Sequence, residues 1–239
     1  MENVLEIKGL NKAYASFSLQ DVTFSMPQGS IMAFIGRNGA GKTTTIKAIL
    51  NFIKKDSGKI CIFGLDNIES ELQIKKSIGY AGGGVDFYKN KKIKDVVAVT
   101  KTFYDNWDDE AYKKYAQVFM LDENKLVKQL SQGMKVKLNL ALALSHGAKL
   151  LILDEPTSGL DPVSRDEILS ILEKLNKKGV SVLFSTHITS DLEKCATHVT
   201  YIQQGKIVAC EEKEKFIKLF GGKTLEEIMI NQERREIDL

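Results

Sequence analysis

Gly36-Arg37-Asn38-Gly39-Ala40-Gly41-Lys42-Thr43 is the stretch of sequence that decides the fold. It matches the pattern GxxxxGK[ST], in which successive backbone N–H groups point inward at phosphate oxygens and glycines let the chain approach them closely. The continuous apolar run 31–35 precedes this loop, and apolar residues at helical spacing follow Lys42. The segment therefore predicts a buried strand, a phosphate-binding loop and a helix in that order, with the positive end of the helix at the loop.

The loop predicts particular contacts with a nucleotide. We expect Lys42 to reach the β- and γ-phosphates and the Thr43 hydroxyl to ligate Mg²⁺, so ATP and Mg²⁺ are the expected cofactors. A glycine-rich turn with a chance Lys-Thr pair is the alternative, and the flanking strand and helix disfavour it. The expected nucleotide-binding residues here, which we call the phosphate loop, are Gly36, Arg37, Asn38, Gly39, Ala40, Gly41, Lys42, Thr43 and Thr44.

A second motif, Leu150-Leu151-Ile152-Leu153-Asp154-Glu155, is an apolar run that ends in two acids. A parallel sheet presents the carboxyl ends of its strands to a ligand crevice, so we expect both carboxylates beside the phosphates. Asp154 is predicted to hold Mg²⁺, and Glu155 to orient and deprotonate the water that attacks the γ-phosphate. Glu155 and Lys42 are therefore expected catalytic residues. An acidic turn after a core strand is the alternative, which the upstream phosphate loop disfavours.

The order of the remaining patterns predicts an α/β fold. Strand-like stretches at 4–8 and 17–26 precede the phosphate loop, a helical and Lys-rich stretch follows it, and buried-strand patterns then return. We expect a P-loop NTPase core with a mixed sheet and N-terminal antiparallel β-strands, plus an inserted α-helical subdomain. The expected division of the single domain 1–239 is an α/β core at 1–81 and 150–239 and a helical subdomain at 82–149.

The charge balance bears on the class of partner. The 239 residues include 34 Lys and Arg against 31 Asp and Glu, a formal net charge of +3. This balance is too even to indicate a polyanionic partner. Only four of the basic residues are Arg, the residue best suited to bidentate reading of base edges. We therefore expect no nucleic-acid partner.

The cysteines and the apolar runs bear on the compartment. Cys61, Cys195 and Cys210 are an odd number without metal-ligand spacing, so neither a disulfide framework nor a zinc site is expected. No signal-peptide pattern follows Met1, and no uncharged apolar run reaches the roughly 18 residues of a spanning helix. We expect a cytoplasmic protein that does not cross a membrane by itself.

A third motif supports a resemblance to a known family. Leu130-Ser131-Gln132-Gly133-Met134 stands upstream of Asp154 at an expected helix start, with Ser131 placed as the N-cap. With the two motifs above, it resembles the LSGGQ signature of nucleotide-binding subunits of ATP-binding-cassette (ABC) transporters, and the resemblance runs nearly end to end. It implies that the Ser131 hydroxyl and the Gly133 backbone N–H contact the γ-phosphate of ATP held by the opposite subunit. Gln132 and Met134 depart from the pattern, and alone the segment is also typical of a capped core helix.

Three further positions fit the same family. Ser158-Gly159-Leu160-Asp161 resembles the D-loop that crosses the dimer interface, so Asp161 is expected near the ATP of the opposite subunit. His187 follows an expected strand and is placed like the switch histidine, which makes it an expected catalytic residue. Tyr14 is placed like the aromatic residue that stacks on adenine. Without the resemblance, His187 is more typical of a surface histidine and Tyr14 of a core aromatic.

One residue of the family pattern is missing. ABC subunits usually carry a glutamine after a strand like 78–80, where it touches Mg²⁺ or the attacking water and contacts the membrane subunit. Here the stretch is Ala81-Gly82-Gly83-Gly84, whose side chains can do neither. We expect Lys42, Glu155, Mg²⁺ and the Ser131 of the opposite subunit to provide most of the charge stabilisation.

The resemblance also implies partners. Because the signature and the phosphate loop lie on different lobes, two copies, or this chain and a related subunit, are expected to meet head to tail with ATP between them. A separate membrane-spanning permease is expected to dock around 82–105, which places the chain at the inner face of the cell membrane, and export is favoured over import. A soluble ABC ATPase acting on ribosomes or DNA and a P-loop kinase or GTPase remain as alternatives. Nothing in the sequence identifies a cargo.

Overall fold

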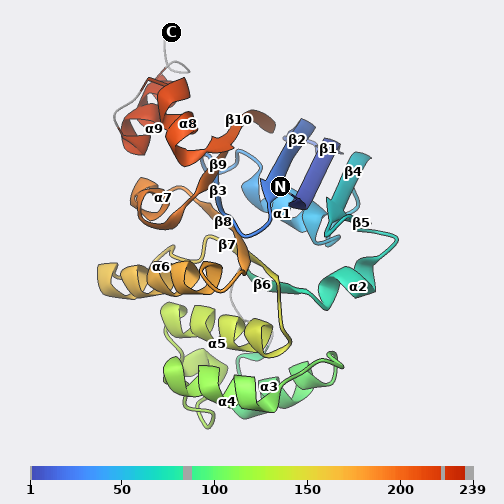
Figure 1. Cartoon of the computed structure of the whole chain (residues 1–239), viewed down its shortest axis with the longest axis vertical. Helices are drawn as coiled ribbons and strands as arrows, with labels where there is room; N and C mark the ends of the chain where they lie inside the picture. Colours follow the sequence, from blue (N-terminus) through green and yellow to red (C-terminus); the bar gives the residue numbers. More distant parts are fainter. Residues whose placement is uncertain (1, 83–87, 222–223, 235–239) are drawn as a thin grey trace.

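Strand β3 (Ile31–Ile35) lies in the middle of the larger of two sheets, and all five of its residues are buried. The computed structural model describes residues 2–82, 88–221 and 224–234 (Figure 1). The larger sheet has the order β10 (Lys206–Glu212), β9 (His198–Gln203), β3, β8 (Ser181–Thr186), β7 (Leu150–Asp154) and β6 (Ile78–Gly82). Strand β10 pairs antiparallel with β9 and every other neighbouring pair is parallel, so the sheet is mixed.

The smaller sheet is antiparallel and comes from the first part of the chain. Its order is β2 (Ser18–Pro27), β1 (Asn3–Ala13), β4 (Ser57–Ile62) and β5 (Leu65–Asp66). Alternate residues of β1 and β2 are buried, as expected for strands with one face on a core. The predicted α/β fold, with a mixed sheet and N-terminal antiparallel strands, is confirmed.

Two buried clusters cover the two faces of the larger sheet. On one face, helix α1 (Lys42–Ile49) and the smaller sheet pack against alternate sheet residues such as Leu150 and Ile152. On the other face, helices α6 (Pro162–Asn176) and α7 (Thr189–Cys195) pack against the intervening residues such as Leu151. The remaining helices of this half are α2 (Glu71–Lys75), α8 (Lys213–Leu219) and α9 (Leu225–Arg234). The sheet thus holds its carboxyl edge rigidly between two packed layers.

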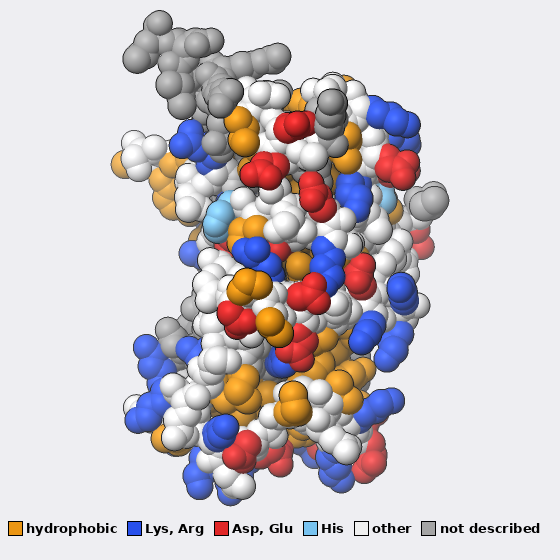
Figure 2. Space-filling model, turned by 90° about the vertical axis from the view of Figure 1, so that its left-hand side faces the viewer, with side chains coloured by type: hydrophobic (Ala, Val, Ile, Leu, Met, Phe, Trp, Pro, Cys, Tyr) orange, Lys and Arg blue, Asp and Glu red, His pale blue; other side chains and the backbone are white. Residues whose placement is uncertain are grey.

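A lobe of helices lies at the lower end of Figure 1, between β6 and β7 along the chain. It consists of α3 (Ile93–Lys101), α4 (Asp109–Val118), the 3₁₀ helix η2 (Val127–Gln129) and α5 (Gln132–Ser145). Helix α5 packs closely on β6, since a Cβ added at Gly79 would lie 2.4 Å from Ala143 Cβ. On the face seen in Figure 2, hydrophobic side chains gather over the lower half of the molecule, among charged side chains of both signs.

The elements differ from the sequence expectation at a few places. Strand β1 runs well beyond the expected 4–8, because Gly9 has φ +63° at a register shift between Ile7 and Leu10, and this irregularity lets the strand continue. Helix α7 was not expected. Of the glycines 82–84, at which the helical subdomain is expected to begin, Gly82, the last residue of β6, lies within the described residues and the other two lie outside them. Among the helices described, none combines the length and apolar composition that a membrane crossing requires.

Candidate active site

The carboxyl ends of four strands lie in one row at the edge of the larger sheet. In register, Phe34 pairs with Ser185, Ser185 with Asp154, and Asp154 with Gly82. The phosphate loop therefore leaves this row after β3, His187 leaves it after β8, and Glu155 leaves it after β7. The strand register alone brings three distant parts of the sequence to one edge, where α/β sheets bind ligands.

The phosphate loop wraps closely on the strand hairpin behind it. A Cβ at Gly36 would lie 2.3 Å from the carbonyl oxygen of Ile202, so this position requires glycine. The N–H of Gly205, in the turn between β9 and β10, donates to the carbonyl oxygen of Ala40 at 3.0 Å. Arg37, Asn38 and Gly39 are exposed in the same loop. The turn between β9 and β10 thus packs against the phosphate loop and leaves residues 37–39 exposed.

Helix α1 begins at the end of the phosphate loop. Its N-cap is Gly41, with φ +115°, and among the described residues no side chain caps this helix. Its first turn contains no acidic residue. Thr43 is exposed and Thr44 is half-buried in that turn. The first backbone N–H groups and the positive end of the helix dipole can therefore meet an anion.

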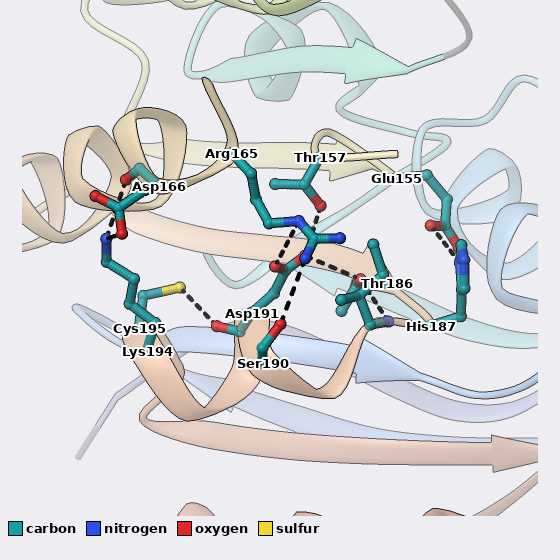
Figure 3. A network of polar contacts seen from close by, with 11 residues as sticks. Glu155, Thr157, Arg165, Asp166, Thr186, His187, Ser190, Asp191, Lys194 and Cys195 are labelled. Carbon is teal, nitrogen blue, oxygen red and sulfur yellow. Dashed lines mark hydrogen bonds and ion pairs between the residues drawn. The ribbon is translucent and has the colours of Figure 1, made fainter. Parts of the chain in front are cut away.

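The three expected catalytic residues are in contact through Glu155. Lys42 is 5% exposed, and its Nζ donates to the carbonyl oxygens of Gly36 at 2.7 Å and Arg37 at 3.2 Å. The same ammonium lies 3.3 Å from Glu155 Oε1. On the other side of the carboxylate, His187 Nδ1 lies 2.8 Å from Glu155 Oε2, as Figure 3 shows. The Glu155 carboxylate is thus held between Lys42 and His187.

The backbone at Glu155 is itself unusual. Its φ of +52° lies in the left-handed region, which L-residues other than glycine rarely adopt. Such strained residues concentrate at active sites, where the surrounding structure holds them in place. The strain supports a role for Glu155 beyond that of an acidic turn.

Ser185 is a site residue that the sequence analysis misses. It is fully buried on β8, and its hydroxyl donates to Asp154 Oδ1 at 2.5 Å and accepts the Glu155 N–H at 2.9 Å. One hydroxyl thus fixes both acids at the end of β7. Burial, with a further contribution from the Asp154 charge, raises the pKa of Tyr80 on the neighbouring strand. The signal that could have revealed Ser185 is a serine that follows the apolar run 182–184 near the carboxyl end of a predicted parallel strand.

Tyr14 lies beside the phosphate loop at the end of β1. The residue is 48% exposed, and Lys12 Nζ lies 5.4 Å from the centroid of its ring. The Tyr14 N–H donates to the carbonyl oxygen of Phe17 at 2.8 Å. The Phe17 ring in turn packs on the loop, since a Cβ at Gly41 would lie 2.9 Å from Phe17 Cζ. An exposed aromatic face is therefore presented next to the loop.

Ser131, Gly133 and Asp161 form a second group away from the phosphate loop. Ser131 is exposed and caps α5 by accepting the Met134 N–H at 3.2 Å. Asp161 caps α6 by accepting the Ser164 N–H at 3.0 Å, and hydrogen bonds from Ser164 are the main cause that lowers the Asp161 pKa. A Cβ at Gly133 would lie 3.6 Å from Ser164 Cβ, so the two helix ends are adjacent. The hydrogen bonds of Ser131 and Asp161 remain within their own helix ends.

The position of the missing glutamine is occupied differently. A Cβ at Gly82 would lie 2.1 Å from Tyr80 Oη, so the tyrosine hydroxyl fills the space in which a side chain would begin. Gly83 and Gly84 lie outside the described residues. Gln132, one of the two departures from the family signature, lines a small cavity together with Gly82 and Glu155.

The donor set fits Mg²⁺ bound together with phosphates. Among the described residues, no cluster of three or more His, Cys, Asp or Glu could hold a metal ion by itself. Mg²⁺ in such sites takes one or two protein oxygens and completes its shell with phosphates and water. The Thr43 hydroxyl, in the first turn of α1, and the Asp154 carboxylate, at the end of β7, are oxygens of that kind. The arrangement suits phosphoryl transfer to water.

The chain is similar to known proteins both in sequence and in fold. A sequence profile described as ABC transporter matches residues 19–158. The chain is 35% identical to the bacitracin transport ATP-binding protein BcrA of Bacillus licheniformis, over 87% of this chain and 69% of that protein. It is 34% identical to the lantibiotic transport ATP-binding protein SrtF of Streptococcus pyogenes, over 96% and 97%. A solved structure of an ATP-binding subunit of an ABC transporter superposes with a TM-score of 0.85 at 27% identity, covering 95% of this chain and 98% of that one.

Proposed function

This chain belongs to the ABC transporter family, and from that premise we propose that it is the ATPase subunit of an export complex, in which a dimer closes around two ATP molecules and drives a separate permease. As a member of that family it is an ATP-binding subunit that hydrolyses ATP. The observation that carries the proposal is the contact of Glu155 with both Lys42 and His187 at the edge of the sheet. The comparisons do not favour a soluble ABC ATPase acting on ribosomes or DNA.

The residues at the sheet edge take separate parts in hydrolysis. Lys42 and the N-terminus of α1 stabilise negative charge on the β- and γ-phosphates. Glu155 accepts a proton from the attacking water, and His187 holds the carboxylate in place through the 2.8 Å contact. Thr43 and Asp154 would hold Mg²⁺, which supplies charge neutralisation at the phosphates when bound.

Dimer formation follows from the separation of the two groups of residues. Ser131 stands at the exposed N-terminus of α5, on another surface of the same chain, so its hydroxyl and the helix end can meet an anion held elsewhere. In a two-fold dimer, the signature end of α5 from one copy caps the phosphate loop of the other. ATP then joins the two copies, and hydrolysis releases them.

A groove between the two lobes is the proposed docking place of the permease. It measures about 320 Å³ and is lined mostly by apolar and aromatic side chains, among them Phe52, Tyr80 and Tyr104. Phe52 is 52% exposed at its rim. Tyr104 lies within the segment 82–105 that the sequence indicates for docking. A helix of the permease with an apolar face fits a groove of this kind.

The cargo class is proposed from the relatives. The two relatives named above are transport proteins for bacitracin and for a lantibiotic, both described in their names. We infer that this chain drives movement of an antimicrobial peptide or a similar amphipathic compound, selected by the permease. The site at the phosphate loop of this chain is suited to a nucleotide, so we assign selection of the cargo to the permease.

The proposal is tested by trapping the dimer in its ATP-bound state. Glu155→Gln removes the base and keeps the shape of the side chain, so the variant is expected to bind ATP with Mg²⁺ and remain dimeric. Size-exclusion chromatography with light scattering then gives a doubled mass with ATP and the monomer mass without it. Glu193→Gln, at an exposed position on α7, is the matched control and is expected to keep wild-type ATPase activity. A Glu155→Gln variant that stays monomeric with ATP contradicts the proposal.

A further inference from the structure

Asp191 is a buried carboxylate that none of the motifs accounts for. It lies on α7 and is 0% exposed. Burying a charged group is costly unless hydrogen bonds and an opposite charge compensate for it. The hydrogen-bond and ion-pair partners of Asp191 therefore indicate its role.

One oxygen of Asp191 holds the two chain segments that carry the catalytic pair (Figure 3). Asp191 Oδ2 accepts the Thr157 hydroxyl at 2.5 Å and the Thr186 hydroxyl at 3.3 Å. Thr157 stands two residues after Glu155, and Thr186 stands directly before His187. A single carboxylate oxygen thus spans both sides of the 2.8 Å contact between Glu155 and His187.

The other oxygen of Asp191 faces the helix that follows the D-loop. Arg165 Nε lies 3.5 Å from Asp191 Oδ1, and Arg165 Nη1 donates to Ser190 Oγ at 3.5 Å. Arg165 stands one turn into α6, where its N–H donates to the carbonyl oxygen of Asp161 at 2.9 Å. Within the part of the chain that the structure describes, neither Arg165 Nε nor Asp191 Oδ1 has a hydrogen-bond partner, so the two groups attract each other at ion-pair distance. Asp191 is therefore connected to the base of the D-loop as well.

We propose that Asp191 is a positioning residue that holds Glu155, His187 and the D-loop in one fixed arrangement. The inference rests on the proposed function, since it concerns the same hydrolysis. Asp191 contacts these elements through Thr157, Thr186 and Arg165 and does not touch the phosphate loop. Its loss should thus slow the chemical step while leaving the binding of ATP nearly unchanged.

A second contact between the same two helices provides a matched control. Lys194 on α7 donates to the carboxylate of Asp166 on α6 and to Ser170 Oγ at 3.1 Å. This pair lies on the outside of the helix pair, with the Asp166 side chain 69% exposed. Figure 3 shows it on the side of Asp191 opposite to His187. Lys194→Ala thus weakens the packing of α6 on α7 without touching the segments that carry the catalytic pair.

The experiment compares kcat, KM for ATP and melting temperature of purified variants. Because displacement of a catalytic group by about 1 Å can cost about a hundredfold in rate, we expect Asp191→Asn to lower kcat by about tenfold or more, with KM within about twofold. Lys194→Ala keeps kcat within about twofold of wild type even where its melting temperature falls. An Asp191→Asn variant with wild-type kcat, or equal kcat losses in both variants, overturns the proposal.

A pair of threonine variants decides the matter if Asp191→Asn does not fold. Thr157→Val removes the hydroxyl at nearly constant volume, and Thr157→Ser retains it. We expect Thr157→Val to lower kcat by about tenfold and Thr157→Ser to stay within about threefold of wild type. Equal kcat values for the two variants contradict the positioning role. If wild type itself fails to hydrolyse ATP, the proposed function fails; if wild type is active and the variants match it, only this inference fails.

Discussion

Replacement of Ser185 by alanine is the perturbation whose effect follows most directly from the geometry. The Ser185 hydroxyl donates to Asp154 Oδ1 at 2.5 Å and accepts the Glu155 N–H at 2.9 Å, inside a fully buried strand. Ser185→Ala removes both hydrogen bonds and introduces no larger group. It leaves a backbone donor and one carboxylate oxygen without this partner at the edge of the sheet.

The size of the effect follows from the two bonds. A hydrogen bond to a charged group contributes about 1.5–3 kcal/mol, and a buried donor without a partner costs about 1–3 kcal/mol. The two bonds share one hydroxyl, so their contributions do not add fully. We expect the free energy of unfolding to fall by about 3 kcal/mol and kcat for ATP hydrolysis to fall by about tenfold, because both acids lose their fixed position.

Urea denaturation followed by circular dichroism measures the loss of stability, and a steady-state ATPase assay measures kcat. Ser181 on the same strand is the matched control, because it is 1% exposed and its hydroxyl accepts the Gly29 N–H at 2.9 Å, at the opposite end of β8 from the site. Ser181→Ala is expected to lose about 1 kcal/mol and to keep wild-type kcat. If Ser185→Ala and Ser181→Ala lose equal stability and keep equal kcat, the reasoning about Ser185 is refuted.

Two further perturbations test the packing and the titration of the lower lobe. Gly79→Ala is expected to destabilise the fold by about 1–3 kcal/mol in urea denaturation, because the new methyl meets Ala143 at 2.4 Å, and Ala143→Gly should restore part of the loss; unchanged stability would show that α5 is not packed tightly on β6. Burial lowers the pKa of His146 below the unfolded-state value of 6.5, so the folded protein binds this proton less readily and loses stability as the pH falls below that value. His146→Phe keeps the stack on Tyr104 and should reduce the loss in melting temperature between about pH 8 and about pH 5.5. Burial also lowers the pKa of His198, so His198 causes part of the loss that remains. An unaltered pH dependence of the melting temperature contradicts the assignment to His146.

The fold was predictable where one short pattern decides the local structure. The run 31–35 is entirely apolar because both faces of a central parallel strand are covered, and Lys42 is the first residue of α1 in the structure as in the sequence pattern. Strand β1 was underestimated because a glycine irregularity at Gly9 interrupts its alternation without ending it. Helix α7 was missed because its seven residues are too few for a periodic pattern to emerge.

The site was predictable as a set of residues and not as a set of contacts. The motifs name Lys42, Glu155 and His187 separately, and only the register of the strands brings them together at one edge. Ser185 and Asp191 carry no motif, because their importance comes from partners far away in the sequence. A buried polar residue becomes visible only when the elements that surround it are assembled.

The central claim, that the Ser131 of one copy caps ATP on the phosphate loop of the other, is tested most directly by mixing two inactive variants. Lys42→Ala removes the ammonium that we expect to contact the phosphates, and Ser131→Arg is designed to obstruct the capping helix end. In a mixed dimer, the loop of the Ser131→Arg copy faces the intact Ser131 of the Lys42→Ala copy. We predict that the mixture regains roughly a quarter of the wild-type ATPase rate, since half of the dimers are mixed and each has one intact site. A mixture no more active than the sum of its two components would contradict the account.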